Sequence, residues 1–126
     1  MDDKTYYGSL AETRVIYELS KKGYHIFNQI SGKAPFDIVI YKDGVMKRVS
    51  IKCCNKKGNT AGTYQIEIGR VRSNKTSNTI YKFDKDECDI LAIYVVEIDE
   101  VFYLDPITIH NKRQVFLNRR IAQTGL

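Results

Sequence analysis

Three polar groups are expected to meet on one face of a β-hairpin. Asp37 lies in a mainly apolar run of residues, and Ser50 and Lys52 lie in the next such run. Because side chains alternate between the two faces of a strand, Ser50 and Lys52 share one face. A carboxylate, a hydroxyl and an ammonium group can exchange protons, form hydrogen bonds and bind charged ligands. Core formation alone does not require them, so their spacing indicates a chemical site.

The turn between the two runs sets the position of Asp37. Asp43 and Gly44 form an Asp-Gly pair between apolar runs, which predicts a hairpin with a two-residue type I′ turn. If this pair is the turn, counting back along both strands places Asp37 directly opposite Ser50, with Cβ atoms roughly 5 Å apart. The other face of the hairpin is then expected to be the buried one.

Length and composition predict one globular domain over residues 1–126. The chain has 126 residues and a mass of 14.6 kDa, which is enough for a single core. Its content of 43% hydrophobic and 28% charged residues is ordinary for a soluble protein. Twenty Lys and Arg against fifteen Asp and Glu give a formal net charge of +5. That charge suits a polyanionic partner without identifying one.

The sequence predicts an intracellular, cytoplasmic protein with no membrane partner. No apolar run approaches the roughly 18 to 20 residues of a transmembrane helix, and the charged residues 1–4 are followed by no apolar segment, so no secretory signal is expected. The three cysteines are odd in number, and Cys53 and Cys54 are adjacent, which argues against a disulfide framework. The cysteines and two histidines have neither zinc-site spacing nor the arrangement of a hydrolytic triad.

Hydrophobic periodicity predicts an α/β (α+β) fold with a mixed sheet and flanking helices. A helix is predicted over residues 5–22, with Gly23 just after its end. Strands are predicted at residues 24–29, 64–68, 90–96 and 101–104 and in the 36–53 hairpin, and the 90–96 run is apolar enough to be covered on both faces. Residues 69–78 are expected to form an exposed loop. Asp105-Pro106 suits the start of a helical turn, and residues 112–123 fit a strand or a helix.

Several short motifs, taken in order, resemble those of a nuclease family. They are Gly8-Ser9-Leu10-Ala11-Glu12, Gly23-Tyr24, Phe36-Asp37-Ile38-Val39, Val49-Ser50-Ile51-Lys52, Asp89-Ile90-Leu91-Ala92-Ile93-Tyr94 and Val101-Phe102-Tyr103-Leu104-Asp105-Pro106. This part of the chain, residues 8–106, resembles the PD-(D/E)XK nuclease superfamily, in particular its homing-endonuclease-like and archaeal Holliday-junction-resolvase-like branches. The resemblance implies a restriction-endonuclease-like fold, with a mixed central β-sheet flanked by helices.

The resemblance also implies a metal-dependent site. Glu12 and Asp37 are the implied ligands of Mg²⁺, for which Mn²⁺ can substitute, and Lys52 is the implied partner of the attacking water and the phosphate. Ser50 stands where the family has an acid or a glutamine, so we expect weaker metal binding than at a three-carboxylate site. The proline that the family places just before the aspartate is displaced to Pro35.

Structural roles compete with these assignments. Ser9 and Glu12 also fit a capping box, in which Glu12 would reach back to the main chain at the start of a helix. Asp37 and Lys52 could form an ion pair that only stabilises the hairpin. Ser50 could simply fill space in the core.

Basic residues after the hairpin form a candidate DNA-binding set. They flank the next two predicted elements, and they are Lys56, Lys57, Arg70, Arg72, Lys75 and Lys82. Phosphate contacts from such loops would be independent of base sequence and strongly salt-dependent. Gln65 and Glu67 lie two positions apart on the predicted 64–68 strand, so they share one face, whose orientation the sequence does not give. Either residue could supply the metal ligand that Ser50 lacks.

Together, the residues and the resemblance predict a metal-dependent DNA endonuclease that hydrolyses phosphodiester bonds with metal-activated water. A domain with one site needs a homodimer to cut both strands, and no other protein partner can be inferred. Two alternatives stay open: a nucleic-acid-binding module that kept the fold and lost catalysis, and an assembly or regulatory protein with an incidental basic surface. The joint presence of Glu12, Asp37 and Lys52 argues against the first.

Overall fold

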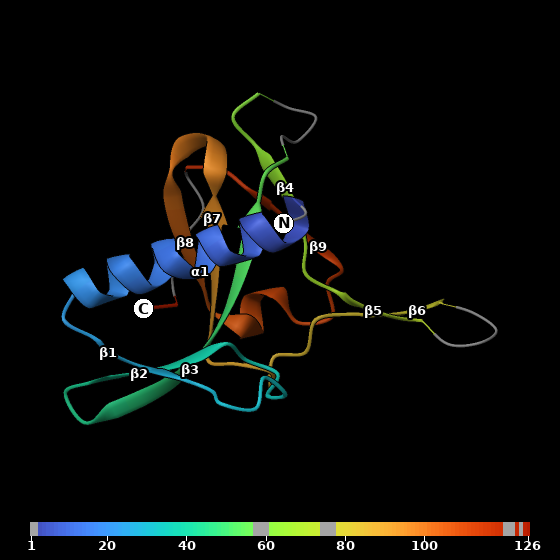
Figure 1. The fold of residues 1–126 in the computed structure, drawn as a ribbon. Coiled ribbons are helices and arrows are strands. Elements are labelled where there is room, and N and C mark those ends of the chain that lie inside the picture. Colours follow the sequence, from blue (N-terminus) through green and yellow to red (C-terminus); the bar gives the residue numbers. More distant parts are fainter. Residues whose placement is uncertain (1–2, 57–60, 74–77, 120–122, 124) are drawn as a thin grey trace.

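A five-stranded mixed sheet forms the centre of the protein. The computed structural model describes residues 3–56, 61–73, 78–119, 123 and 125–126. Helix α1 (Asp3–Lys21) packs on one face of the sheet, as Figure 1 shows. The strands follow the spatial order β1 (His25–Asn28), β2 (Ile38–Lys42), β3 (Val45–Cys54), β7 (Ile90–Val95), β8 (Glu100–Leu104). The predicted mixed sheet with helical cover is confirmed.

The centre of the sheet is a parallel pair. Strands β3 and β7 run parallel, whereas β1–β2, β2–β3 and β7–β8 are antiparallel. All six residues of β7 are buried, which confirms that this strand is covered on both faces. Alternate residues of β7 contribute to two different cores. Leu91, Ile93 and Val95 belong to one of them, and Ile90, Ala92 and Tyr94 belong to the other.

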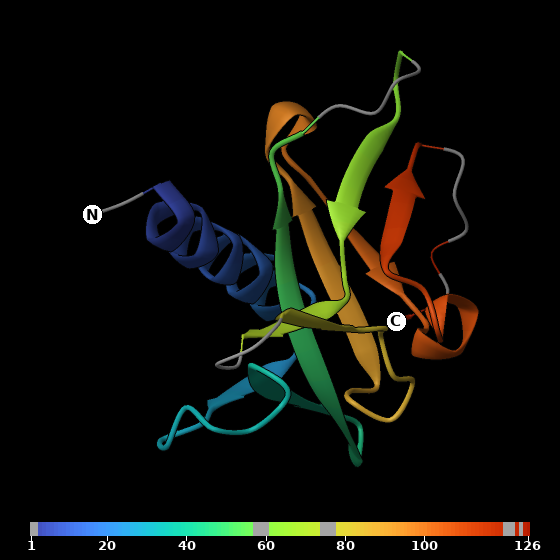
Figure 2. The same cartoon turned by 90° about the vertical axis from the view of Figure 1, so that its right-hand side faces the viewer.

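Two cores lie on opposite faces of the sheet. The first is formed by Ala11, Val15 and Leu19 of α1 with inward-facing residues of β2, β3, β7 and β8. The second lies under a smaller layer in which β4 (Tyr64–Glu67) pairs with β9 (Gln114–Leu117), beside the 3-10 helix η2 (Pro106–Ile109). Figure 2 shows the order of layers: α1, the sheet, then β4 and β9. The sequence left open whether residues 112–123 form a strand or a helix, and residues 114–117 of this region form strand β9.

The hairpin has the predicted turn and register. Both turn residues have positive φ angles, 53° at Asp43 and 81° at Gly44, as a type I′ turn requires. Lys42 pairs with Val45, and the ladder continues to Ile38, which pairs with Val49. Local turn chemistry therefore fixes which residues of the two strands face each other.

The prediction of a loop over residues 69–78 is wrong for residues 70–73 and 78, which belong to strands, and residues 74–77 lie outside the described residues. Strands β5 (Arg70–Ser73) and β6 (Asn78–Tyr81) pair there as an antiparallel ribbon that extends from the body of the domain in Figure 1. Such a ribbon is held by its own main-chain hydrogen bonds, so it needs no alternating apolar stripe. A second 3-10 helix, η1 (Val96–Ile98), leads into Asp99, which has a left-handed backbone with φ of 51°.

The helices of the described part of the chain are too short or too polar to span a membrane.

Candidate active site

Asp37 is held against β3 on both sides of Ser50. Its main-chain N–H donates to the carbonyl of Val49 at 2.9 Å, and its Oδ2 atom accepts the main-chain N–H of Ile51 at 2.6 Å. Strand β2 begins one residue later, at Ile38. The Asp37 carboxylate therefore accepts the hydrogen bond of a β3 amide just before β2 begins. This hydrogen bond fixes the position of the carboxylate.

Glu12 comes from α1 and approaches Asp37. The pKa of the Glu12 carboxyl is raised above its ordinary value, first by partial burial and then by the negative charge of Asp37. The fold therefore brings two carboxylates from distant parts of the sequence within electrostatic reach of each other.

The capping-box interpretation of Glu12 is wrong. Helix α1 begins at Asp3, so Ser9 lies inside the helix and not at its N-cap. The carbonyl of Ser9 accepts a hydrogen bond from the Thr13 hydroxyl at 2.9 Å, an ordinary contact within a helix. Glu12 consequently has no role in starting α1.

Ser50 is buried, at 6% exposure. Its hydroxyl donates to the carbonyl of Pro35 at 3.3 Å. Its partner in the parallel ladder is Leu91, which belongs to the second core. Both faces of β3 are therefore covered at this point, whereas the sequence predicted burial of only the opposite face.

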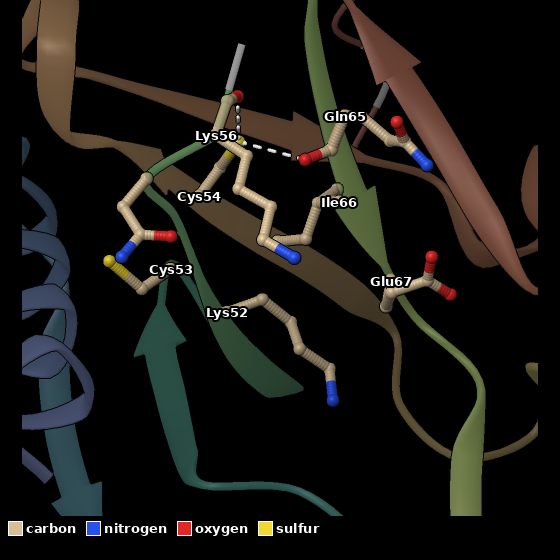
Figure 3. Close-up of a pocket in the computed structure, with 8 residues that line it drawn as sticks. Lys52, Cys53, Cys54, Lys56, Gln65, Ile66 and Glu67 are labelled. Carbon is tan, nitrogen blue, oxygen red and sulfur yellow. Dashed lines mark hydrogen bonds between the residues drawn. The ribbon is translucent and has the colours of Figure 1, made fainter. Parts of the chain in front are cut away.

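Lys52 borders a cleft of about 250 Å³ between β3 and β4. Gln65, Ile66 and Glu67 line the cleft from β4. In Figure 3, the Lys52 and Lys56 side chains extend from the β3 side into the cleft, whereas those of Gln65 and Glu67 point away from the two lysines. The core takes Tyr64 and Ile66, so Gln65 and Glu67 share the opposite face of β4, an orientation that the sequence left open. The amide of Gln65 also donates to the side chain of Gln114 on β9.

Asp37 and Lys52, both in the described part of the chain, form no ion pair. The Asp37 carboxylate instead binds the main chain of β3, and the Lys52 side chain borders the cleft. The interpretation of this pair as a structural salt bridge is therefore wrong.

The predicted DNA-binding residues come from several different elements of the chain. Lys56 lines the cleft, Arg70 and Arg72 belong to β5, and Lys82 is exposed directly after β6. The other two predicted residues, Lys57 and Lys75, lie outside the described residues.

Comparison with known proteins identifies the family. A family model described as PD-(D/E)XK endonuclease matches residues 1–124. The chain belongs to this endonuclease family. Protein 5.3 of Escherichia phage T7 is 29% identical over 110 residues, which make up 85% of this chain and 86% of that protein. The predicted resemblance to PD-(D/E)XK nucleases is confirmed.

A solved structure supports the same fold. The bacterial homing endonuclease I-Ssp6803I is similar to this PD-(D/E)XK endonuclease with a TM-score of 0.82, over 95% of this chain and 83% of that one. The two sequences are 18% identical, so this likeness concerns the fold. It confirms the predicted fold class.

PD-(D/E)XK nucleases generally use divalent metal ions, and two carboxylates of this chain suit one. After partial burial, the negative charge of Asp37 helps to raise the pKa of Glu12, and a hard cation held by both carboxylates would offset that repulsion. In the described ranges, no group of three or more His, Cys, Asp or Glu residues is arranged to hold a metal ion.

An ion pair that the sequence did not reveal anchors strand β3. The Arg48 guanidinium binds both carboxylate oxygens of Asp89 at 3.0 and 3.1 Å, and the Asp89 N–H donates to the Arg48 carbonyl at 2.8 Å. These contacts hold the pKa of Asp89 below its usual range. These contacts hold β3 against β7 close to Ser50. Because Arg48 and Asp89 lie 41 positions apart, no local sequence pattern predicts that they pair.

The cysteines have structural roles near the cleft. Burial, reinforced by the neighbouring Cys54, raises the pKa of the Cys53 thiol to about 11, so this thiol stays protonated and unreactive at neutral pH. The Cys54 thiol contacts the carbonyls of Lys56 and Gln65 and so links the end of β3 to β4.

Proposed function

We propose that this protein is a metal-dependent DNA endonuclease, with Glu12, Asp37 and Lys52 as its active-site residues. The observation that carries the proposal is the approach of the Glu12 carboxylate to Asp37, in a chain of the PD-(D/E)XK endonuclease family. The helix and the hairpin that supply these residues each fold for local reasons. Their convergence places two like charges together, at a cost that packing alone does not explain.

Glu12 and Asp37 would hold the metal ion, Mg²⁺ or in its place Mn²⁺. Asp37 is positioned by the Ile51 N–H, so its carboxylate needs little reorganisation to act as a ligand. Glu12 adds the second negative charge from α1. When bound, a divalent cation lowers the pKa of a coordinated water and offsets charge on the phosphate.

Lys52 would stabilise the reacting phosphate. Its ammonium group is not neutralised by Asp37 and borders the cleft, so its charge is available to a phosphate oxygen and to the attacking water. The water oxygen forms the new bond to phosphorus and the bond to the 3′ oxygen breaks. The products are then a 5′ phosphate and a 3′ hydroxyl, the outcome expected from the family resemblance.

Ser50 would contribute structure and not a ligand. Its hydroxyl hydrogen is used by the Pro35 carbonyl, and a neutral serine oxygen is a poorer partner for Mg²⁺ than a carboxylate. Metal affinity is consequently weaker than at a three-carboxylate site. The enzyme needs correspondingly more Mg²⁺ for half-maximal activity.

Cutting both strands of a duplex requires two copies of the site. One chain supplies one set of Glu12, Asp37 and Lys52, so a symmetric homodimer is the simplest active form. The excess of basic residues favours DNA as the partner. A cytoplasmic location is part of this proposal.

One observation favours a second candidate. A buried serine occupies the position where an acid or glutamine is expected, which suits a DNA-binding module that has lost catalysis. Such a module would retain DNA in a salt-dependent manner and cut nothing in any metal ion.

The direct test uses purified protein with plasmid, linear duplex and four-way junction DNA, each with Mg²⁺, Mn²⁺ or a chelator. We expect cutting that the chelator abolishes, and the best substrate names the DNA form that the enzyme recognises. DNA retention without cutting would favour the binding module. Neither retention nor cutting would overturn both candidates and favour an assembly or regulatory role.

A further inference from the structure

A polar network, which we call the α1 network, joins α1 to β7, β8 and the turn between them; its members are Arg14, Glu18, Tyr94, Asp99 and Tyr103. Arg14 donates through Nη1 to the Glu18 carboxylate at 2.8 Å. Through Nε and Nη2 it also donates to the carboxylate and the main-chain carbonyl of Asp99, at 3.0 and 3.1 Å. The Tyr94 hydroxyl donates to the same Asp99 carboxylate at 2.8 Å, and the Tyr103 hydroxyl donates to Glu18 at 2.8 Å.

Two members of the α1 network are fixed in the core of the protein. Tyr94 and Tyr103 are 6% and 2% exposed, in the core that also contains Val15 and Leu19 of α1. Burial and the hydrogen bond to Glu18 raise the pKa of the Tyr103 hydroxyl, so this group stays protonated and remains a donor at neutral pH. The two hydroxyls therefore give the network fixed points on the sheet.

Asp99 has a backbone conformation that suits its contact with Arg14. Its φ of 51° lies in the left-handed region, which residues other than glycine seldom adopt. In this conformation Asp99 presents both its carboxylate and its main-chain carbonyl to one guanidinium group. The planar fork of an arginine can donate to two acceptors at once, whereas a lysine has a single ammonium group. The contact thus depends on the shape of the Arg14 side chain as well as on its charge.

The α1 network restricts movements of α1 that apolar packing alone would allow. Ala11, Val15 and Leu19 pack in the core between α1 and the sheet, and hydrophobic burial has no preferred direction. Hydrogen bonds depend on both distance and angle. Because Arg14 and Glu18 lie about one turn apart, the network holds α1 at two points. Two such points oppose both sliding and rotation of the helix.

Glu12 moves with the same helix. Helix α1 is continuous from Asp3 to Lys21, and Glu12 lies two residues before Arg14, about 3 Å along the helix axis and about 200° around it. The network therefore holds one side of α1, while Glu12 lies on a different side, within electrostatic reach of Asp37. A shift of α1 that breaks the contacts of Arg14 would also displace Glu12, and about 1 Å is enough to impair a reacting geometry.

We propose that the α1 network positions Glu12 for metal binding, with Arg14 and Asp99 as its central positioning residues. This rests on the proposed function, in which Glu12 is a metal ligand. Arg14 acts through Glu12 and is not itself a catalytic residue. The Asp99 side chain is 71% exposed, and an ion pair this exposed adds little to folding stability. The position that the network imposes on α1 therefore matters more than the energy of the ion pair.

The test uses substitutions that conserve charge. Arg14→Lys keeps the positive charge and loses the planar fork, and Tyr103→Phe removes only a hydroxyl. Arg119→Lys is the matched control for the first, because Arg119 forms an exposed ion pair with Glu100 outside the network. Tyr17→Phe is the matched control for the second, because Tyr17 lies on α1 and is 59% exposed.

The first measurement is made without metal. Each protein is prepared with and without Glu12→Gln, and melting temperatures are compared in chelator at pH 7. In the parent, Glu12→Gln removes the repulsion by Asp37 and raises the melting temperature. In Arg14→Lys and Tyr103→Phe, Glu12 is no longer held near Asp37, so the same substitution should give at most about half of that increase. The two controls should give the parent's full increase.

The second measurement is the affinity of the same proteins for Mg²⁺ by titration calorimetry. Arg14→Lys and Tyr103→Phe should bind Mg²⁺ about 3- to 30-fold more weakly than the parent, and the controls should match it. In the Glu12→Gln background, the network substitutions should have no further effect, because they act through Glu12. If the network variants keep both the parent's melting-temperature increase and its Mg²⁺ affinity, the network has only a structural role and the proposal is overturned.

The metal-free measurement separates this proposal from the proposed function. A parent that binds no Mg²⁺ refutes the metal-dependent nuclease, whereas the melting temperatures in chelator still decide whether the α1 network holds Glu12 near Asp37. A parent that binds Mg²⁺ through Glu12, with an affinity and a melting-temperature increase that Arg14→Lys and Tyr103→Phe leave unchanged, retains the nuclease and refutes the positioning role.

Discussion

Asp37 and Ile51 are joined by a 2.6 Å hydrogen bond from a main-chain N–H to a carboxylate oxygen. The same carboxylate is the proposed metal ligand. The Asp37 side chain therefore has two roles: it accepts a hydrogen bond from the main chain of β3, and it would bind the metal ion. Because only the second role requires a negative charge, the two roles can be separated by substitution.

Asp37→Asn and Asp37→Ala should differ in stability and agree in activity. Asparagine keeps an oxygen that accepts the Ile51 N–H, whereas alanine leaves this amide without its partner, at a cost of about 1–3 kcal/mol in the free energy of unfolding. Both variants should lose cleavage, because neither carries the charge. Urea denaturation and DNA cleavage measure the two effects. Equal stability of the two variants would show that the hydrogen bond is unimportant.

Glu12→Gln should stabilise the metal-free protein at neutral pH while it abolishes cleavage. The folded-state pKa of Glu12 is raised, so its contribution to stability is fully present below its ordinary value of 4.5 and is lost as pH rises through the folded value. At pH 7 the charged carboxylate therefore opposes folding. Melting temperatures of both proteins in chelator should differ at pH 7 and converge below pH 4.5.

Added Mg²⁺ provides the control for Glu12→Gln. The ion should raise the melting temperature of the parent and have little effect on the variant, because ligand binding stabilises only a protein that holds the ligand. A variant that melts below the parent at pH 7 in chelator would contradict the repulsion between Glu12 and Asp37.

Ser50→Ala should affect stability more than chemistry. The substitution removes the hydrogen bond to the Pro35 carbonyl and leaves that acceptor unpaired, which costs about 1 kcal/mol. Cleavage and its Mg²⁺ dependence should stay close to the parent's, since serine is not a ligand in this account. A folded Ser50→Ala protein that needs much more Mg²⁺ would instead place the hydroxyl in the metal site.

Asp89→Asn should loosen the anchor between β3 and β7. The pKa of Asp89 is lowered by Arg48, so its contribution to stability is present above the ordinary value of 3.8 and is lost as pH falls through the folded value. Both side chains are about 40% exposed, and solvent screening reduces the effect to about 1 kcal/mol at pH 7. Denaturation curves of the two proteins should converge in acid. A constant difference at every pH would rule out the charge as its cause.

Local chemistry explains what the sequence could predict. The Asp43-Gly44 turn specifies its own geometry, and from it the position of Asp37 beside Ser50 follows by counting along two strands. Helix α1 and the fully buried β7 likewise follow from hydrophobic pattern. These features depend on residues close together in the chain.

The remaining features depend on contacts between distant segments. The approach of Glu12 to Asp37 requires α1 to pack on the sheet, and only family resemblance suggested it beforehand. The Arg48–Asp89 anchor joins residues 41 positions apart. The pairing of β5 with β6 was missed because these strands pair with each other and need no apolar stripe.

Glu12, Asp37 and Lys52 are proposed to form one metal-dependent catalytic site. The most direct measurement is the rate of DNA cleavage in Mg²⁺ by the parent, Glu12→Gln, Asp37→Asn and Lys52→Ala, each confirmed as folded by its thermal transition. We expect the parent to cut DNA and each variant to cut it at least about 100-fold more slowly. Variants that cut at the parent's rate would show that the chemistry takes place elsewhere.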